Sequence, residues 1–282
     1  MNYKAEPLGT EKYRLGEGPC YDQVAGILSW VDIMDGKLWQ MGPDGERRAF
    51  DLGQPIGAAV PVKDSDGFVL CAMDGLYLYD GKKAELMHDL TEIYKPYLRC
   101  NDAKADPSGR LWFGSSVNDD HPAEGNLYKL ENGQISIMQA DTKISNGLAW
   151  SSDRKSFYFS DTLKYAVFVY DYDEISGTIS NCRELFKPEN GATDGLCIDA
   201  EDNLWVAFWG GRRVEHRSGR TGKLMDIVEV DALHVTSCCF GGADMQTLFI
   251  TTSGDGLDGE YDGCLFTCRP GVKGVSVEGI IL

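Results

Sequence analysis

The feature that most constrains the fold is a short aromatic and β-branched segment that recurs along the chain. Its six copies begin at residues 28, 68, 111, 157, 204 and 248, at intervals of 40 to 47 residues. Each copy follows a turn rich in Gly, Asp or Asn and an earlier apolar segment, and two further strand-like segments precede the next copy. Four short strands per repeat, at this period, are typical of the blades of a β-propeller.

Six such repeats account for nearly all of the 282 residues. We therefore predict an all-β fold, a six-bladed β-propeller of four-stranded antiparallel blades that forms one domain over residues 1–282. The best helical window, residues 89–98, is interrupted by Pro96. In a propeller the first strand of each repeat lines the central channel, and pairing of the chain ends commonly closes the ring. The N-terminal segment 2–10 and the C-terminal segment 275–282 are the candidates for this closure.

The composition excludes several kinds of partner. The chain has 27 Lys and Arg against 44 Asp and Glu, a formal net charge of -17, and no basic stripe, which argues against nucleic acid. No apolar stretch approaches the roughly eighteen residues of a membrane span, and no secretory signal is recognisable, so we expect a cytoplasmic protein with no membrane partner. The 9 cysteines are odd in number and several lie in apolar segments, which favours buried thiols. A monomer or weak homo-oligomer is expected.

Residues ten or eleven positions before each aromatic segment should lie at equal height around the channel. These positions hold Glu17, Ala58, Asn101, Asn146, Asp194 and Ser237. Five of the six side chains carry oxygen, and burying such atoms without a partner is costly. Two carboxylates and two carboxamides on one axis form a ligand set typical of calcium, although magnesium, manganese, zinc and iron also accept oxygen donors. The alternative is a polar cap on the channel that is satisfied by ordered water.

Several segments of the chain resemble the signature motifs of one family. They are GEGP at 16–19, RCNDAKADPSGR at 99–110, ISNGLAW at 144–150, DGLCIDA at 194–200 and TSCCFGG at 236–242. These segments are similar, in order and over essentially the whole chain, to those of the senescence marker protein, gluconolactonase and luciferin-regenerating enzyme family. The resemblance implies a six-bladed propeller with one divalent metal cation in its central channel, and hydrolysis of small-molecule sugar lactones.

The same resemblance implies roles for individual residues. Glu17, Asn146 and Asp194 would bind the metal, and Asp194 would also act as the general base or orient the attacking water. Arg99 and Asn101 would hold the oxygens of the substrate.

Two positions differ from the pattern of many members of the family. Ala103 replaces a Gly, and Asp119 aligns with a substrate-contacting Glu of some members and has a shorter reach. His121, in the same loop as Asp119, is a further candidate for the mouth of the channel.

The leading prediction is a metal-dependent hydrolase that opens a sugar-derived (aldono-) lactone to its acid. One alternative is hydrolysis of another ester or an organophosphate electrophile at the same site, and another is a non-catalytic calcium-binding propeller. Ordinary structural roles also remain open for two residues: an ion pair for Arg99, and a turn satisfied by its own backbone for Asn101. A purely structural metal site needs neither residue, so their presence favours an enzyme.

Overall fold

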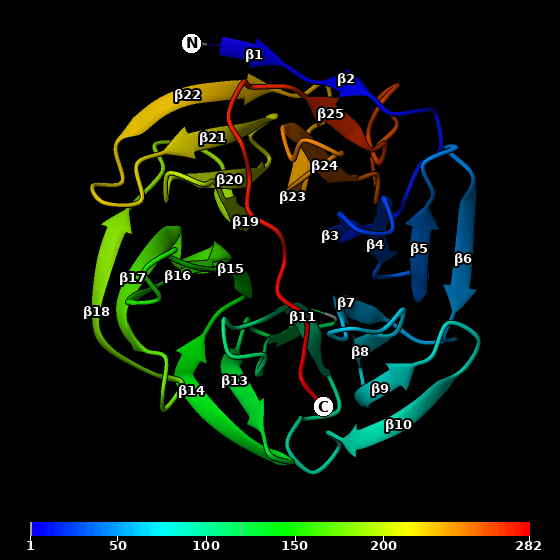
Figure 1. Ribbon diagram of the computed structural model, residues 1–282, viewed down its shortest axis with the longest axis vertical. Coiled ribbons are helices and arrows are strands. Elements are labelled where there is room, and N and C mark those ends of the chain that lie inside the picture. Colours follow the sequence, from blue (N-terminus) through cyan, green and yellow to red (C-terminus); the bar gives the residue numbers. More distant parts are fainter. Residues whose placement is uncertain (1, 119) are drawn as a thin grey trace.

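The structure, a computed structural model, describes residues 2–118 and 120–282. Over these residues the strands form six sheets set around a central axis (Figure 1), which confirms the predicted six-bladed propeller. The four main strands of each blade are antiparallel to their neighbours, and each blade runs outward from the axis. The innermost strands are β3 (Gly16–Asp22), β7 (Ile56–Pro61), β11 (Leu98–Ala105), β15 (Ser145–Trp150), β19 (Ala192–Ile198) and β23 (His234–Gly241).

The six predicted aromatic segments fall on the second strands. These are β4 (Ile27–Asp32), β8 (Phe68–Ala72), β12 (Leu111–Val117), β16 (Ser156–Asp161), β20 (Leu204–Trp209) and β24 (Thr247–Ser253). The third strands are β5 (Lys37–Met41), β9 (Gly75–Tyr79), β13 (Gly125–Glu131), β17 (Ala166–Asp173), β21 (Arg213–Arg217) and β25 (Phe266–Cys268). The outer strands of the first five blades are β6 (Arg47–Asp51), β10 (Ala84–Asp89), β14 (Gln134–Thr142), β18 (Thr178–Phe186) and β22 (Leu224–Glu229).

The N-terminal segment closes the ring. Strand β2 (Glu6–Pro7) pairs antiparallel with β25 and completes the sixth blade, while β1 (Asn2–Lys4) adds to β22 as a parallel fifth strand of the fifth blade. This confirms the closure predicted for segment 2–10. Both additions are at the outer edge of the ring (Figure 1).

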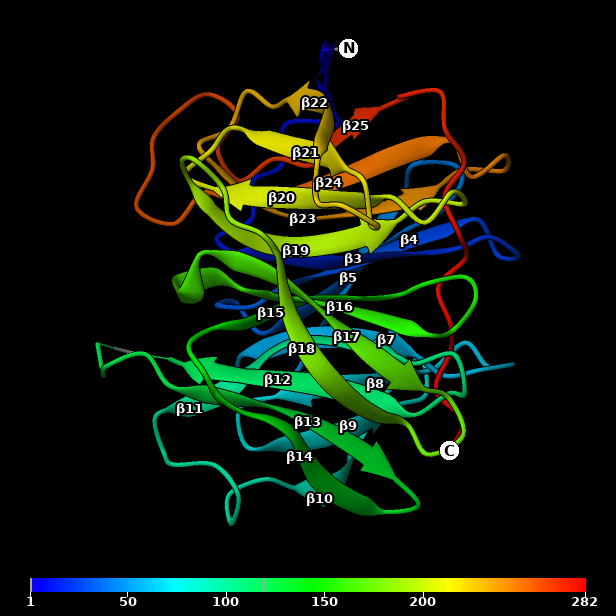
Figure 2. The same ribbon diagram turned by 90° about the vertical axis from the view of Figure 1, so that its left-hand side faces the viewer.

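The closure predicted for the C-terminal segment was wrong, because β2 already occupies the outer edge of the sixth blade. Residues 272–282, which we call the C-terminal strap, instead cross one mouth of the channel (Figures 1 and 2). The strap is fixed by backbone hydrogen bonds to the ends of inner strands. Ala200 donates to the carbonyl of Lys273 at 2.8 Å, and Ile280 donates to the carbonyl of Pro61 at 2.8 Å.

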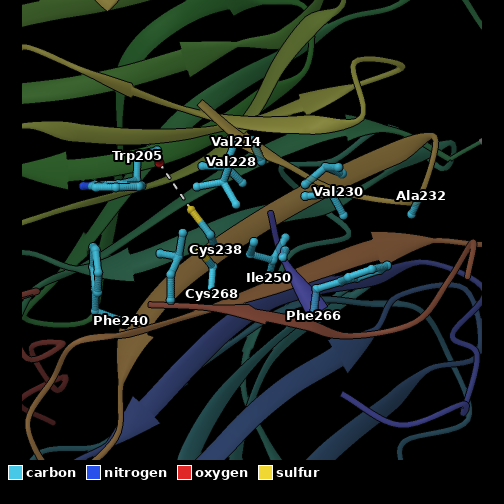
Figure 3. Close-up of a cluster of buried hydrophobic side chains, with 14 of the residues drawn as sticks. Trp205, Val214, Val228, Val230, Ala232, Cys238, Phe240, Ile250, Phe266 and Cys268 are labelled. Carbon is cyan, nitrogen blue, oxygen red and sulfur yellow. Dashed lines mark hydrogen bonds between the residues drawn. The ribbon is translucent and has the colours of Figure 1, made fainter. Parts of the chain in front are cut away.

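The core fills the spaces between blades, which is why the second strands are apolar on both faces. Trp30, Trp112 and Trp205 on these strands are fully buried. Figure 3 shows the cluster between the fifth and sixth blades, where the Cys238 thiol donates to the carbonyl of Trp205 at 3.3 Å. All nine cysteines are free thiols, and all except Cys182 and Cys197 are buried, in agreement with the sequence prediction.

Helix is nearly absent from residues 2–118 and 120–282. The helical turn that these residues contain is the 3-10 segment η1 (Thr162–Lys164). No helix in this part of the chain has the length and apolar character that crossing a membrane requires.

Candidate active site

Each of the six inner strands has a register shift, typical of a β-bulge, at or directly beside the predicted ring position. The pairing register shifts between Glu17 and Cys20 on β3. It shifts between Asn146 and Leu148 on β15, and the other four inner strands have equivalent shifts. A bulge leaves one residue outside the ladder and redirects its side chain. The repeated bulge therefore places the ring residues at one height near the strand starts, at the mouth of the channel opposite the C-terminal strap.

Glycines beside the ring residues let the inner strands approach one another closely. A Cβ at Gly147 would lie 2.8 Å from the carbonyl oxygen of Asp194, and a Cβ at Gly195 would lie 2.2 Å from Ser237 Oγ. A side chain at either position would push adjacent blades apart. The Asn-Gly and Asp-Gly pairs of the sequence thus have a packing reason as well as a place in the family motif.

The structure brings Glu17, Asn146 and Asp194 together from the first, fourth and fifth blades. All three side chains are buried. Asn146 Nδ2 donates to Asp194 Oδ1 and, at 2.9 Å, to Thr162 Oγ1, whereas Asn146 Oδ1 is buried without a hydrogen-bond partner. Glu17 Oε2 accepts a hydrogen bond from the Gly18 amide at 2.8 Å.

Burial and mutual repulsion of the carboxylates dominate the electrostatics of this cluster. Burial, together with the charge of Asp102, raises the pKa of Glu17 to about 8, although Gly18, Arg99 and Lys104 act in the opposite direction. Burial, together with the charges of Glu17 and Asp102, raises the pKa of Asp194 well above its usual value. The charges of Arg99 and Lys104 therefore do not offset the burial and mutual repulsion of these acids.

A hard divalent cation fits these residues. No group of three or more His, Cys, Asp or Glu side chains in the described part of the chain is arranged to hold a metal ion. A site here therefore needs the amide oxygen of Asn146 beside the carboxylates of Glu17 and Asp194. That amide oxygen is the buried atom without a partner, and a cation would satisfy it while compensating the two carboxylates.

Arg99 and Asn101 lie beside this cluster on β11. Arg99 is buried, and its Nη1 donates to Asn101 Oδ1 at 2.7 Å and to the Cys100 carbonyl at 2.8 Å. Its Nε is buried without a partner, and burial lowers the pKa of Arg99 although the charges of Glu17 and Asp194 act against this. Both hydrogen bonds from Nη1 go to neutral oxygens, which does not favour the ion-pair alternative.

Asn101 does not have the turn role considered from the sequence. It lies within β11, and its Nδ2 donates across to the carbonyl of Ser145 in the next blade at 3.0 Å. This bond, with the one from Arg99, fixes the side chain between two blades.

The loop that holds Asp119 and His121 provides little evidence for a role in the site. Asp119 lies outside the residues that the structure describes. His121 is exposed, and its ring stacks on that of Tyr97, with 3.9 Å between the centroids. Tyr97 immediately precedes β11, so His121 lies near the predicted mouth, but the structure gives it no contact with the ring residues.

Two charged residues in the channel received no role from the sequence. Asp102 is buried, and Lys104 is partly buried with its Nζ bonded to backbone carbonyls of two other blades. The signal was present, because charged residues at 102 and 104 alternate with the buried alanines 103 and 105 of an inner strand. Both charged residues line a cavity of about 260 Å³ that continues to residues 275–278 of the strap.

Comparison with known proteins identifies the class to which this propeller belongs. Residues 15–254 match the family described as the SMP-30/Gluconolactonase/LRE-like region. The chain belongs to this family, as its motifs predicted.

The chain is also similar to individual proteins of known name. Regucalcin of Gallus gallus is 35% identical over 270 residues, which cover 92% of this chain and 89% of that protein. A Bacillus subtilis protein named "Putative sugar lactone lactonase YvrE" is 35% identical over 248 residues, 85% of this chain and 83% of that protein. A solved structure of regucalcin from Agrobacterium tumefaciens, described as a calcium-binding protein, has a TM-score of 0.93 and 26% identity, and the match covers 100% of this chain and 99% of that one.

Proposed function

We propose that the protein is a metal-dependent lactonase that opens a sugar-derived lactone to its acid. The observation that carries this proposal is the position of the buried Arg99, with a free Nε donor, beside the oxygen cluster of Glu17, Asn146 and Asp194. A site that only bound a cation would have no use for such a donor. The family, and the name of the Bacillus subtilis relative, support the lactone as substrate class.

We assign the cation to Glu17, Asn146 and Asp194. A bound divalent cation would supply a Lewis acid for the lactone carbonyl and a charge that favours deprotonated water. The oxygen-only donor set favours calcium, and the calcium-binding description of the Agrobacterium tumefaciens regucalcin supports the same choice. Manganese, magnesium, zinc and iron accept the same donors, so the test below compares all five cations.

In this proposal Asp194 has a second role toward the attacking water. Its carboxylate accepts the hydrogen bond of a water molecule and orients that water toward the carbonyl carbon. Attack forms the new C–O bond and the ring C–O bond of the lactone breaks. One proton of the water passes to the ring oxygen, which leaves as a hydroxyl group, and the other remains on the new carboxyl group. The product is an aldonic acid, which ionises at neutral pH and releases one proton.

Arg99 and Asn101 position the substrate in the proposed mechanism. The unpartnered Nε–H of Arg99 suits a hydroxyl or carbonyl oxygen of the sugar, because a guanidinium keeps its charge and its planar geometry. Asn101 holds the guanidinium through its Oδ1. Arg99 and Asn101 would thus position the oxygen atoms of the sugar, and a lactone without sugar hydroxyls should be hydrolysed poorly.

The test is proton release from aldono-lactones, followed with a pH indicator. The panel contains glucono-, galactono-, xylono- and arabinono-lactones, with a simple alkyl lactone and an organophosphate ester as controls. The protein is first treated with a chelator and then supplied with calcium, magnesium, manganese, zinc or iron(II). We expect release only with metal and only from sugar lactones. Release from the organophosphate alone, or from no compound with folded protein, would overturn the proposal.

A further inference from the structure

Lys104 connects three inner strands beside the candidate metal centre. Its Nζ donates to the carbonyl of Leu148 at 2.8 Å and to the carbonyl of Leu196 at 2.6 Å. These carbonyls belong to β15 and β19, each two residues beyond a proposed metal ligand, Asn146 and Asp194. The ammonium of the third blade is therefore fixed directly behind the ligands of the fourth and fifth blades.

Asp102 accompanies Lys104 on the same strand. Both side chains line the cavity between the ring residues and the C-terminal strap. Asp102 Oδ1 accepts a hydrogen bond from the Ala103 amide at 2.7 Å. Burial raises the pKa of Asp102, and the charge of Lys104 and this hydrogen bond act against that rise. The same two residues act on Glu17 in opposite directions, since Asp102 raises its pKa and Lys104 lowers it.

We propose that the opposite charges of Asp102 and Lys104 together set the affinity of the centre for its divalent cation. Lys104 weakens cation binding by repulsion, and Asp102 strengthens it. In the metal-free protein the charge of Lys104 is favourable instead, because it partly compensates the buried acids. This inference rests on the proposed assignment of a cation to Glu17, Asn146 and Asp194.

The sign of one substitution separates this role from a structural one. Lys104→Met keeps most of the length of the unbranched side chain and removes its charge. If Lys104 only held the strands, its loss would loosen the centre, and the cation would bind more weakly or equally well. If its charge opposes the cation, chelated Lys104→Met protein should bind Ca²⁺ and Mn²⁺ more tightly, by roughly tenfold or more, because charges interact more strongly in a protein interior than in water.

The chain offers a matched control for the loss of a buried ammonium. Lys129 is buried, and its Nζ also donates to two carbonyls, those of Ser176 at 3.0 Å and Gly177 at 3.1 Å. It lies on β13 and pairs with Glu131 at 2.9 Å. Lys129→Met should lower the melting temperature and leave cation affinity unchanged.

The measurement is calorimetric titration of chelated protein with Ca²⁺ and with Mn²⁺, accompanied by thermal melts with and without each ion. We expect tighter binding and a larger metal-induced rise in melting temperature for Lys104→Met, unchanged affinity for the charge-conserving Lys104→Arg, and at least roughly tenfold weaker binding for Asp102→Asn. If Lys104→Met does not fold, unchanged affinity in Asp102→Asn still overturns the proposal.

The failures of the two proposals are distinguishable. Unchanged or weaker binding by folded Lys104→Met overturns the inference about Asp102 and Lys104, while a wild-type protein that binds cations and hydrolyses lactones retains its proposed function. A folded wild-type protein that binds no divalent cation overturns both.

Discussion

Replacing Arg99 with Met tests whether the site handles a substrate or only a cation. The guanidinium has two bonds from Nη1 to neighbouring oxygens, and its buried Nε–H has no partner. A hydrogen bond from a charged group contributes about 1.5–3 kcal/mol. Loss of this single donor to the substrate should therefore lower kcat/KM by roughly ten- to hundredfold.

Cation binding should respond differently to the same change. The positive charge of Arg99 acts on Glu17 and Asp194, so its removal should leave the affinity for Ca²⁺ unchanged or higher. The assay is indicator-detected lactone hydrolysis with saturating metal, paired with calorimetric Ca²⁺ titration. Arg183→Met, on the exposed outer strand β18, is the control for losing an arginine. A fall in kcat/KM of less than threefold, or a lower affinity for Ca²⁺, would refute the substrate-positioning role of Arg99.

Three further predictions concern the metal ligand and the framework. Asp194→Ala should abolish lactone hydrolysis and weaken Ca²⁺ binding together, and a variant that keeps more than roughly a tenth of the activity would contradict the two roles of Asp194. Asp106→Ala should destabilise the protein by about 3 kcal/mol in urea unfolding, because it orphans buried donors, among them Tyr172 Oη at 2.8 Å; an unchanged midpoint would contradict this. Burial lowers the pKa of His216, but its bonds to Asp199 and Asp226 outweigh this and raise the pKa above 6.5. This contribution to stability should be complete below about pH 6.5 and lost as the pH rises through the folded-state pKa, whereas His216→Gln should lack that dependence.

The sequence was sufficient for the architecture because the fold is repetitive. Each blade must bury an apolar second strand between two neighbours, so the pattern returns with every blade and its period reveals the fold. The ring positions could be counted for the same reason, and Asn146 and Asp194 prove to be in contact across two blades. Nothing comparable marks the ends of the chain. The segment 275–282 has the alternating pattern of a strand, but the place of that strand is already taken by β2.

The parts of the site that sequence reasoning missed depend on interactions across blades. Lys104 is near Leu148 and Leu196 only because three separate inner strands meet in the channel. The bond from Asn101 to the Ser145 carbonyl likewise depends on packing between blades, so its turn alternative remained open until the structure was known. Residue types and spacing identify which side chains reach the axis. The partners of those side chains depend on how the blades pack against one another, which the sequence pattern does not reveal.

Closure by the N-terminal segment also constrains how the protein is made. β2 precedes all six blades in the chain, whereas its partner β25 is translated only after the first five blades. Until then β2 has no edge to join, and the incomplete arc of blades ends in an exposed apolar sheet face, the kind of surface that promotes association between chains. Glu6 must then find Thr267, a contact between distant positions that is slow to form. Until the ring is completed, newly synthesised chains are therefore open to association with one another, and a bulky fusion next to β1 should slow that completion.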